Sequence, residues 1–155
     1  MNSACNKLYK RSFLLSSDIF FLERIFIEDF EFNTRVFAKA KKVLATDLLV
    51  AQFLQSPNSI TRNTSPEKRK KMVSDILIVL RKTKETYQDY QPSNDLETTH
   101  FFKERLGFLV ATLFYQLFKN KASYDEIKEI KQQLIDDQSF YISHPIFQKN
   151  KDFFR

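Results

Sequence analysis

Apolar positions recur at helical spacing along much of this chain, beginning at residue 28. Phe30, Asn33, Phe37 and Ala40 mark one stripe, and Phe32, Val36 and Ala40 mark the neighbouring one, with basic residues outside both. Side chains three and four positions apart share one face of an α-helix. The pattern therefore predicts a helix over residues 28–40.

Three further helices are predicted downstream, each opened by a residue type that favours a helix start. The Ser-Pro-Glu sequence at residues 65–67 opens a long amphipathic helix that ends before Pro92. Asn94, followed three residues later by a glutamate, opens the most hydrophobic helix, whose apolar positions continue to Leu117. Ser123, also followed by a glutamate at the third position, opens the last one.

The segments around these helices suggest how the chain is organised. Short apolar runs predict strands or extended segments at residues 42–45 and 49–54. Proline, serine, threonine and asparagine at residues 55–66 indicate a linker, so we divide the chain into residues 1–62 and 63–155. The tail, residues 140–155, is predicted to pack as short helical or irregular pieces. The expected fold is mainly α, with one or two short strands ahead of a C-terminal helical bundle.

Composition narrows the class of protein. The chain has 155 residues, 43% of them hydrophobic, which is enough for one proper core. Its single glycine, Gly107, excludes a self-contained phosphate-cradling loop or dinucleotide fingerprint, because these motifs need several glycines for close backbone approach. The apolar material is mostly phenylalanine, with 17 residues and no tryptophan, so large rings should close the core.

Charge and cysteine content bear on partners and compartment. Lys and Arg number 25 and Asp and Glu 19, a net charge of +6 that permits an anionic partner such as a membrane surface. Cys5 is the sole cysteine, which leaves no disulfide framework and fits a reducing, cytoplasmic setting. Residues 1–11 lack the apolar run of a signal peptide, and no stretch approaches the ~18 apolar residues of a membrane span.

Most residues with reactive or charged side chains favour ordinary roles. His100 and His144 lie far apart and show no metal-ligand spacing with acids or Cys5. Four consecutive basic residues, Lys68 to Lys71, fall in the first turns of a helix, where a solvated face is favoured over a phosphate or lipid contact. Nucleic-acid binding is disfavoured, because acids are scattered along the chain and no nucleic-acid motif is present.

Glu28 and Asp29 are the sharpest candidates for chemistry. They follow an apolar patch and precede a helix, where backbone amides and the helix dipole keep a carboxylate ionised. An ionised carboxylate can act as a general base near neutral pH. Acids are also common in the first turn of ordinary helices, so spacing alone favours a structural role.

Five blocks of sequence stand out in order along the first part of the chain, at residues 6–14, 19–21, 28–33, 38–43 and 57–61. Taken together, they resemble the family 2 glycosyltransferases of bacterial surface-polysaccharide synthesis. The resemblance covers residues 6–62 and matches the part that follows the nucleotide-sugar half of those enzymes. The remainder looks like the C-terminal helical extension common in that family.

The resemblance implies a cytosolic GT-A type enzyme that transfers a sugar, with inversion, from a nucleotide-sugar donor to a saccharide or lipid-linked acceptor. Asp29 matches the aspartate that takes the proton from the attacking hydroxyl, and Glu28 is the supporting acid beside it. Lys7 and Arg11 fall in the block that lines the acceptor side. The family holds the donor through a divalent metal, Mg or Mn, and works peripherally at the inner membrane face.

Two departures from the family pattern qualify this implication. The Asp-x-Asp metal site of the donor half occurs nowhere in the chain, so no cofactor is expected on this chain itself. Phe53 and Leu54 stand where the family often carries a Tyr-Arg pair. We therefore expect the acceptor-side part of such an enzyme, inactive without a donor-binding domain or partner subunit. The alternative is a non-enzymatic helical interaction module.

Overall fold

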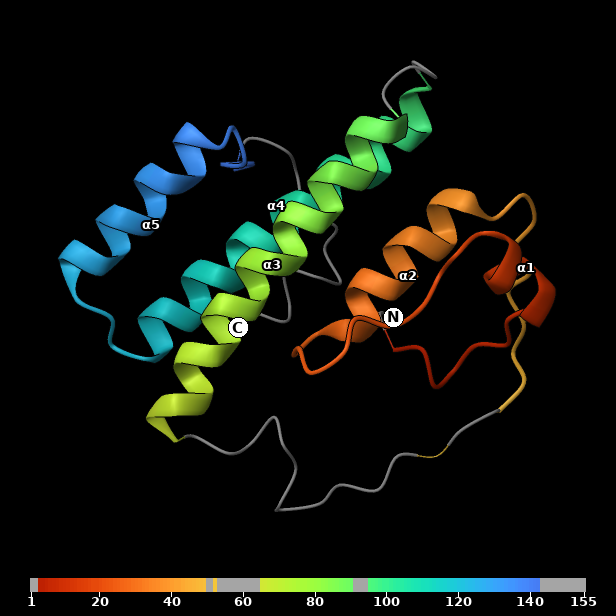
Figure 1. The fold of residues 1–155 in the computed structure, drawn as a ribbon, viewed down its shortest axis with the longest axis horizontal. Coiled ribbons are helices and arrows are strands. Elements are labelled where there is room, and N and C mark those ends of the chain that lie inside the picture. Colours follow the sequence, from red (N-terminus) through yellow and green to blue (C-terminus); the bar gives the residue numbers. More distant parts are fainter. Residues whose placement is uncertain (1–2, 50–51, 53–64, 91–94, 143–155) are drawn as a thin grey trace.

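The computed structural model describes residues 3–49, 52, 65–90 and 95–142, and these form a mainly helical protein (Figure 1). The mainly α expectation is confirmed. The helices, in chain order, are α1 (Arg11–Ser16), α2 (Glu28–Lys39), α3 (Pro66–Tyr90), α4 (Leu96–Lys119) and α5 (Tyr124–Asp136).

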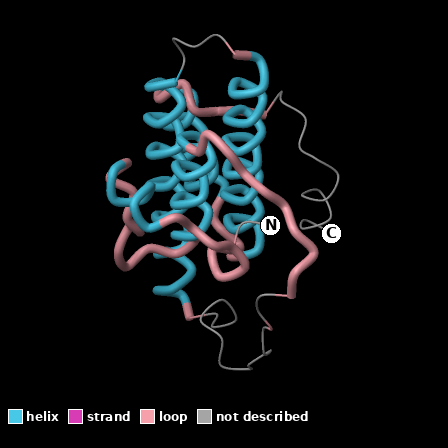
Figure 2. Tube along the Cα trace, turned by 90° about the vertical axis from the view of Figure 1, so that its right-hand side faces the viewer, coloured by secondary structure: helices cyan, strands magenta, loops and turns pink. Residues whose placement is uncertain are grey.

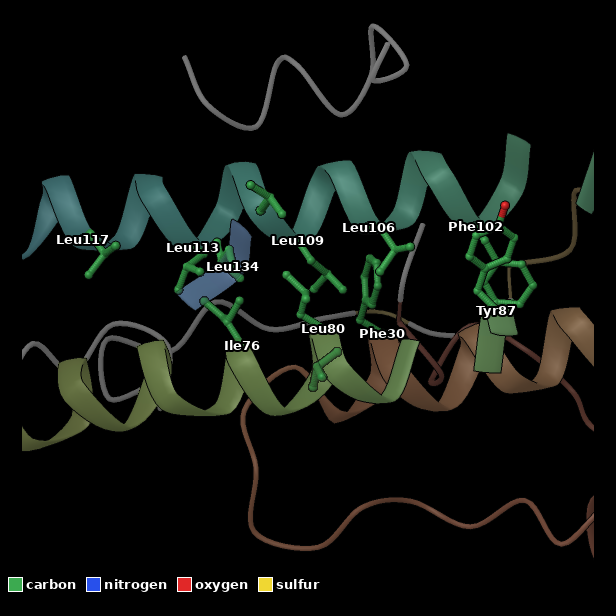
Figure 3. Close-up of a cluster of buried hydrophobic side chains, with 12 residues drawn as sticks. Phe30, Ile76, Leu80, Tyr87, Phe102, Leu106, Leu109, Leu113, Leu117 and Leu134 are labelled. Atoms are coloured by element: carbon green, nitrogen blue, oxygen red, sulfur yellow. The ribbon is translucent and has the colours of Figure 1, made fainter. Parts of the chain in front are cut away.

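The centre of the fold is the antiparallel pair formed by the two longest helices, α3 and α4 (Figure 1). Phe102 near the start of α4 meets Tyr87 near the end of α3, with ring centroids 5.2 Å apart. Ile76 and Leu113, at the other end of the pair, point into the same core from opposite sides (Figure 3). Each helix contributes its apolar stripe, because burying these stripes against one another removes them from water.

The helices α2 and α5 complete this core. Phe30 of α2 is 5% exposed and stacks on Phe108 of α4, with centroids 5.6 Å apart and planes 12° from parallel. Leu134 of α5 is buried in the same cluster, and the end of α5 is tied to α3 by a hydrogen bond from the Lys84 ammonium to the Asp137 carbonyl. Figure 2 shows the helices gathered side by side as a bundle.

The N-terminal segment packs on α2 in a second, smaller cluster. Ile19, Phe32 and Val36 are its buried members. Phe21 lies flat against Phe32 with centroids 3.9 Å apart, and Tyr9 meets the same ring edge-on at 5.3 Å. The outer face of α2 is therefore covered by residues that precede it in the chain.

The predicted helix boundaries agree with the structure, with one correction at a cap. Ser123 caps α5 by accepting a hydrogen bond from the Glu126 amide at 3.2 Å, as expected. For α4 the capping residue is Asp95, whose carboxylate accepts from the amides of Glu97 and Thr98. The predicted cap, Asn94, lies outside the described residues. Asn and Asp are equally good helix caps, so the sequence could not decide whether the helix begins after Asn94 or after Asp95.

The predicted strand at residues 42–45 is not formed, and no strand occurs in the part of the chain that the structure describes. Of the second predicted strand, Leu49 and Gln52 are described and are not in a strand, whereas residues 50, 51, 53 and 54 lie outside. A strand needs a neighbour to pair with, and local apolar pattern cannot supply one. The acceptor-side remnant of a GT-A fold stays a prediction.

The division between residues 62 and 63 falls outside the described residues, as does most of the predicted tail beyond residue 142. Helices from the two sides of that division share one core, since Phe30 packs with Ile76 and Leu106.

Within the described ranges, none of the helices combines the length and apolar content needed to span a membrane.

Candidate functional site

The loop that leads into α2 is held in an unusual backbone conformation by contacts from α3. Arg24 and Ile27 both have positive φ, 59° and 58°, a region disfavoured for branched or bulky side chains. Asp75 of α3 is 4% exposed, and its Oδ2 accepts a hydrogen bond from the Phe26 amide at 2.7 Å. Lys71 donates to the Arg24 carbonyl at 2.7 Å. These contacts fix where α2 begins.

Glu28 and Asp29 are the first two residues of α2, and both are half-buried. Ile27 at the N-cap has no side-chain oxygen to accept from the first-turn amides, so the acids of that turn stabilise this end of the helix. The sequence placed both acids correctly in the first turn. The hydrogen-bonded network described next includes the backbone carbonyl of Asp29.

Asp29 lies beside two residues of the N-terminal segment. Its negative charge adds to burial in raising the pKa of Tyr9, and it opposes burial, which lowers the pKa of Lys7. Tyr9 donates its phenol hydrogen to Asn33 Oδ1 at 2.8 Å, and the Asn33 amide donates to the Asp29 carbonyl at 2.8 Å. The first turn of α2 and residues 7–9 therefore form one polar cluster.

Burial sets the ionisation of the Tyr9 and Lys7 side chains. It raises the pKa of Tyr9 to about 12, with the charge of Asp29 adding to the effect. Burial also lowers the pKa of Lys7, an effect that Arg105 reinforces and Asp29 opposes. Near neutral pH the Tyr9 phenol therefore keeps its proton.

Arg105 of α4 closes the cluster from the side of the core. It donates to Thr34 Oγ1 at 2.7 Å and to the Phe30 carbonyl at 2.9 Å, and its guanidinium lies 4.0 Å from the centroid of the Phe30 ring. Burial lowers its pKa to about 10, partly offset by the charge of Glu104. The Thr34 hydroxyl and the Phe30 carbonyl are both neutral acceptors. Arg105 therefore joins α4 to α2 through these two hydrogen bonds, neither of which is to a carboxylate.

The remaining acid of this turn, Glu31, has a structural role. It is 2% exposed, and both of its oxygens accept from Arg35, at 2.6 and 2.7 Å. Arg35 in turn donates to the Phe20 carbonyl, which fixes the N-terminal segment against α2. Asp75, Glu85 and Asp137 likewise form ion pairs with basic residues within 4.0 Å.

Other candidates from the sequence lie away from this cluster. His100 lines an open groove of about 400 Å³ on α4, together with Leu96 and Phe101, whereas His144 is outside the described residues. Cys5 and Arg11 are exposed. The described residues contain no group of three or more histidines, cysteines and acids that could hold a metal ion.

The basic run in α3 is more than a solvated face. Lys71 pairs with Asp75 at 2.6 Å and lies 5.3 Å from the centroid of the Phe26 ring, so it belongs to the contact that holds the loop before α2. Lys70 is exposed, whereas Lys68 and Arg69 are half-buried. One member of the run therefore contributes to the fold.

Sequence reasoning did not find the polar side chains around the first turn of α2. Tyr9 and Arg105 come from distant parts of the chain and reach α2 only after folding, whereas Asn33 lies four residues after Asp29 on the same helix. Asn33 stands among the apolar residues of its helix, and Arg105 interrupts the most hydrophobic helix. A polar residue on an apolar face is the one local signal that could have marked them, because buried polar groups require partners.

The fold and this cluster define a mainly helical protein with a polar site at the start of α2. Comparison with protein-family models, curated proteins and solved structures finds no match to this chain.

Proposed function

We propose that this chain is the acceptor-side part and helical extension of a family 2 glycosyltransferase, with Asp29 as the general base. The observation that carries the proposal is the convergence of three sequence blocks that resemble the family. Residues 6–14 meet residues 28–33 through the bond between Tyr9 and Asn33, and residues 19–21 meet them through the stacked rings of Phe21 and Phe32. Asp29 lies where these blocks come together.

The proposed step is an inverting sugar transfer. The acceptor hydroxyl oxygen forms a bond to the anomeric carbon as the bond from that carbon to the nucleotide diphosphate breaks. The hydroxyl proton passes to the Asp29 carboxylate, which serves as the base. Tyr9, whose pKa is raised to about 12, keeps its proton and holds Asn33, while Lys7 provides a nearby positive charge.

A divalent metal and the nucleotide-sugar belong to the missing donor half in this proposal. The described residues do not fit a metal site, because they bring no three ligand-type side chains together. The sequence also has no Asp-x-Asp. The residues of this chain accordingly orient the acceptor and receive its proton, and they do not hold the donor.

The test supplies the full chain with the donor-binding half of a family 2 enzyme and measures transfer of labelled sugar to a saccharide acceptor. We expect transfer that requires both parts. Asp29→Asn should reduce it by roughly 10²–10⁴-fold, the usual contribution of a general base. Asp18→Asn is the matched control, since Asp18 is exposed and asparagine tolerates its positive φ.

This experiment tests the assignment to the family and the role of Asp29 as base separately. Absence of transfer from the complemented wild-type chain contradicts the assignment to the family. Transfer that survives Asp29→Asn contradicts the base alone. Thermal melting of both variants shows whether each keeps the wild-type fold.

One observation favours the alternative, a helical interaction module. The residues after α2 expose large aliphatic side chains: Val43 is 62% exposed, Leu44 80%, Leu48 72% and Leu49 90%. In that case Glu28 and Asp29 are ordinary first-turn acids. The module predicts a cooperative thermal unfolding transition without added metal or nucleotide, and Asp29→Asn then leaves partner affinity unchanged.

A further inference from the structure

The chain that leaves α2 is an apolar segment that no described element covers. Residues 42–49 are in neither helix, turn nor strand, and after the end of α2 they turn and run down the side of the view on which α1 lies (Figure 1). No residue from 41–49 belongs to either hydrophobic cluster. Exposing four large aliphatic side chains within seven residues is costly in water, so the segment is suited to contact with another surface.

The backbone of this segment is also unpaired within the described residues. After the Ala40 amide, which ends α2, no backbone hydrogen bond joins residues 41–49 to another backbone group there. The Leu48 amide reaches only the Thr46 hydroxyl, at 3.4 Å. Free amides and carbonyls on a stretch outside any helix are a template for pairing with another strand. A strand is therefore a better occupant than a helix or a flat apolar surface.

The charged residues of this segment indicate which partner strand would pair with it. Lys41 lies at one end and Asp47 at the other, and both are exposed. In an antiparallel pair, residues directly opposite one another interact most strongly, and opposite charges there are favourable. A copy of the same segment, turned around a twofold axis at Leu44, puts Lys41 opposite Asp47 at both ends.

We propose that residues 41–47 pair in antiparallel register with the same segment of a second copy of this chain. In this register Leu44 meets its own equivalent, and Val43 faces Ala45. If the twofold axis passes through residue 43, 45 or 46 instead of Leu44, Asp47 does not face a lysine of residues 41–49. The contact is isologous, as most homodimer contacts are. It does not rest on the glycosyltransferase proposal, and it gives the interaction-module alternative a specific partner.

The expected association is weak, because a single pair of short strands is only marginally stable in water. Sedimentation equilibrium on the full chain, up to millimolar protein concentration, measures it. We expect a reversible monomer–dimer equilibrium. Lys41→Glu or Asp47→Lys should each weaken it roughly tenfold, since either change puts like charges opposite one another at both ends. The double variant should restore the wild-type dissociation constant.

The matched control is Lys42→Glu, which makes the same charge change at an exposed neighbouring position that faces Thr46 of the second copy. It should alter the dissociation constant far less than Lys41→Glu does. A chain that stays monomeric at all concentrations overturns the proposal. So does a dimer in which Lys41→Glu and Lys42→Glu act alike, or in which the double variant restores nothing. None of these results bears on sugar transfer by the complemented chain.

Discussion

Asp75 of α3 accepts the backbone amide of Phe26 at 2.7 Å, across 49 positions of sequence, and so fixes the loop from which α2 begins. The same carboxylate oxygen lies 2.6 Å from Lys71 Nζ. Because the loop contains two residues with positive φ, this contact sets the position of the first turn of α2 against the bundle. The location of Asp29 thus depends on a residue of another helix.

Replacing Asp75 should therefore destabilise the protein. Asp75→Ala leaves the Phe26 amide and the Lys71 ammonium without their acceptor, which should lower the free energy of unfolding by about 2–3 kcal/mol. Urea denaturation followed by circular dichroism measures the change. Asp89→Ala, at an exposed position of the same helix, should change it by less than about 0.5 kcal/mol. Equal effects would mean that the contact contributes little.

Arg105 should not be replaceable by lysine. Arg105→Lys loses the geometry that reaches both Thr34 Oγ1 and the Phe30 carbonyl, together with the planar contact to the Phe30 ring. We expect a loss of about 2 kcal/mol in the free energy of unfolding. Arg81→Lys, on the exposed side of α3, is the control and should be close to neutral. A neutral Arg105→Lys would argue against the link between α4 and α2.

Phe102 should be among the most sensitive core positions. Its side chain is fully buried and meets the rings of Tyr87, Tyr90 and Phe101. Phe102→Ala should cost about 3–5 kcal/mol, because it combines lost transfer free energy with a cavity. Phe118→Ala removes the same atoms from a side chain that is 66% exposed and should cost far less. Thermal melting of the two variants separates burial from helix propensity.

Removing the charge of Asp29 should shift the titration of its neighbours. Burial raises the pKa of Tyr9 and lowers that of Lys7, and the charge of Asp29 pushes both pKa values upward, so Asp29→Asn should lower both. NMR titration of the two side chains measures the shifts. Asp18→Asn should leave both pKa values where they are, since the Asp18 charge affects neither group. Unchanged values in Asp29→Asn would place the carboxylate outside the cluster.

The raised pKa of Tyr9 leads us to expect a loss of stability at alkaline pH. Its pKa is about 12 in the folded state against an ordinary 10.0, so between these values the folded state binds more protons than the unfolded state. The stabilisation from Tyr9 is complete below pH 10 and is lost as pH rises toward 12. Tyr9→Phe should remove this component, which the difference between the two unfolding profiles isolates. Parallel profiles would contradict the raised pKa.

The helices were largely predictable because their information is local. Residues 28–40 were predicted as a helix and α2 spans Glu28–Lys39, and the start of α3 at Pro66 follows directly from the Ser-Pro-Glu signal. Caps and stripes depend on neighbours within one or two turns, so they can be read along the chain. Residues 42–45 were predicted as a strand or an extended segment, and they form no strand in the structure, since strand formation depends on a partner that no local pattern supplies.

For the candidate site, the sequence by itself determined that two acids, Glu28 and Asp29, begin a helix. The role of Asp29 as a base stays a prediction. Only the tertiary structure decided which side chains surround it. Lys7, Tyr9 and Arg105 reach the first turn of α2 from either side of it in the sequence, and the loop before that turn is held by Asp75 from 49 positions away. Helical spacing fixes neighbours within a few residues, whereas burial of apolar faces fixes which distant segments meet. The polar groups beside Asp29 follow from that packing, and so does the apolar segment that it leaves exposed.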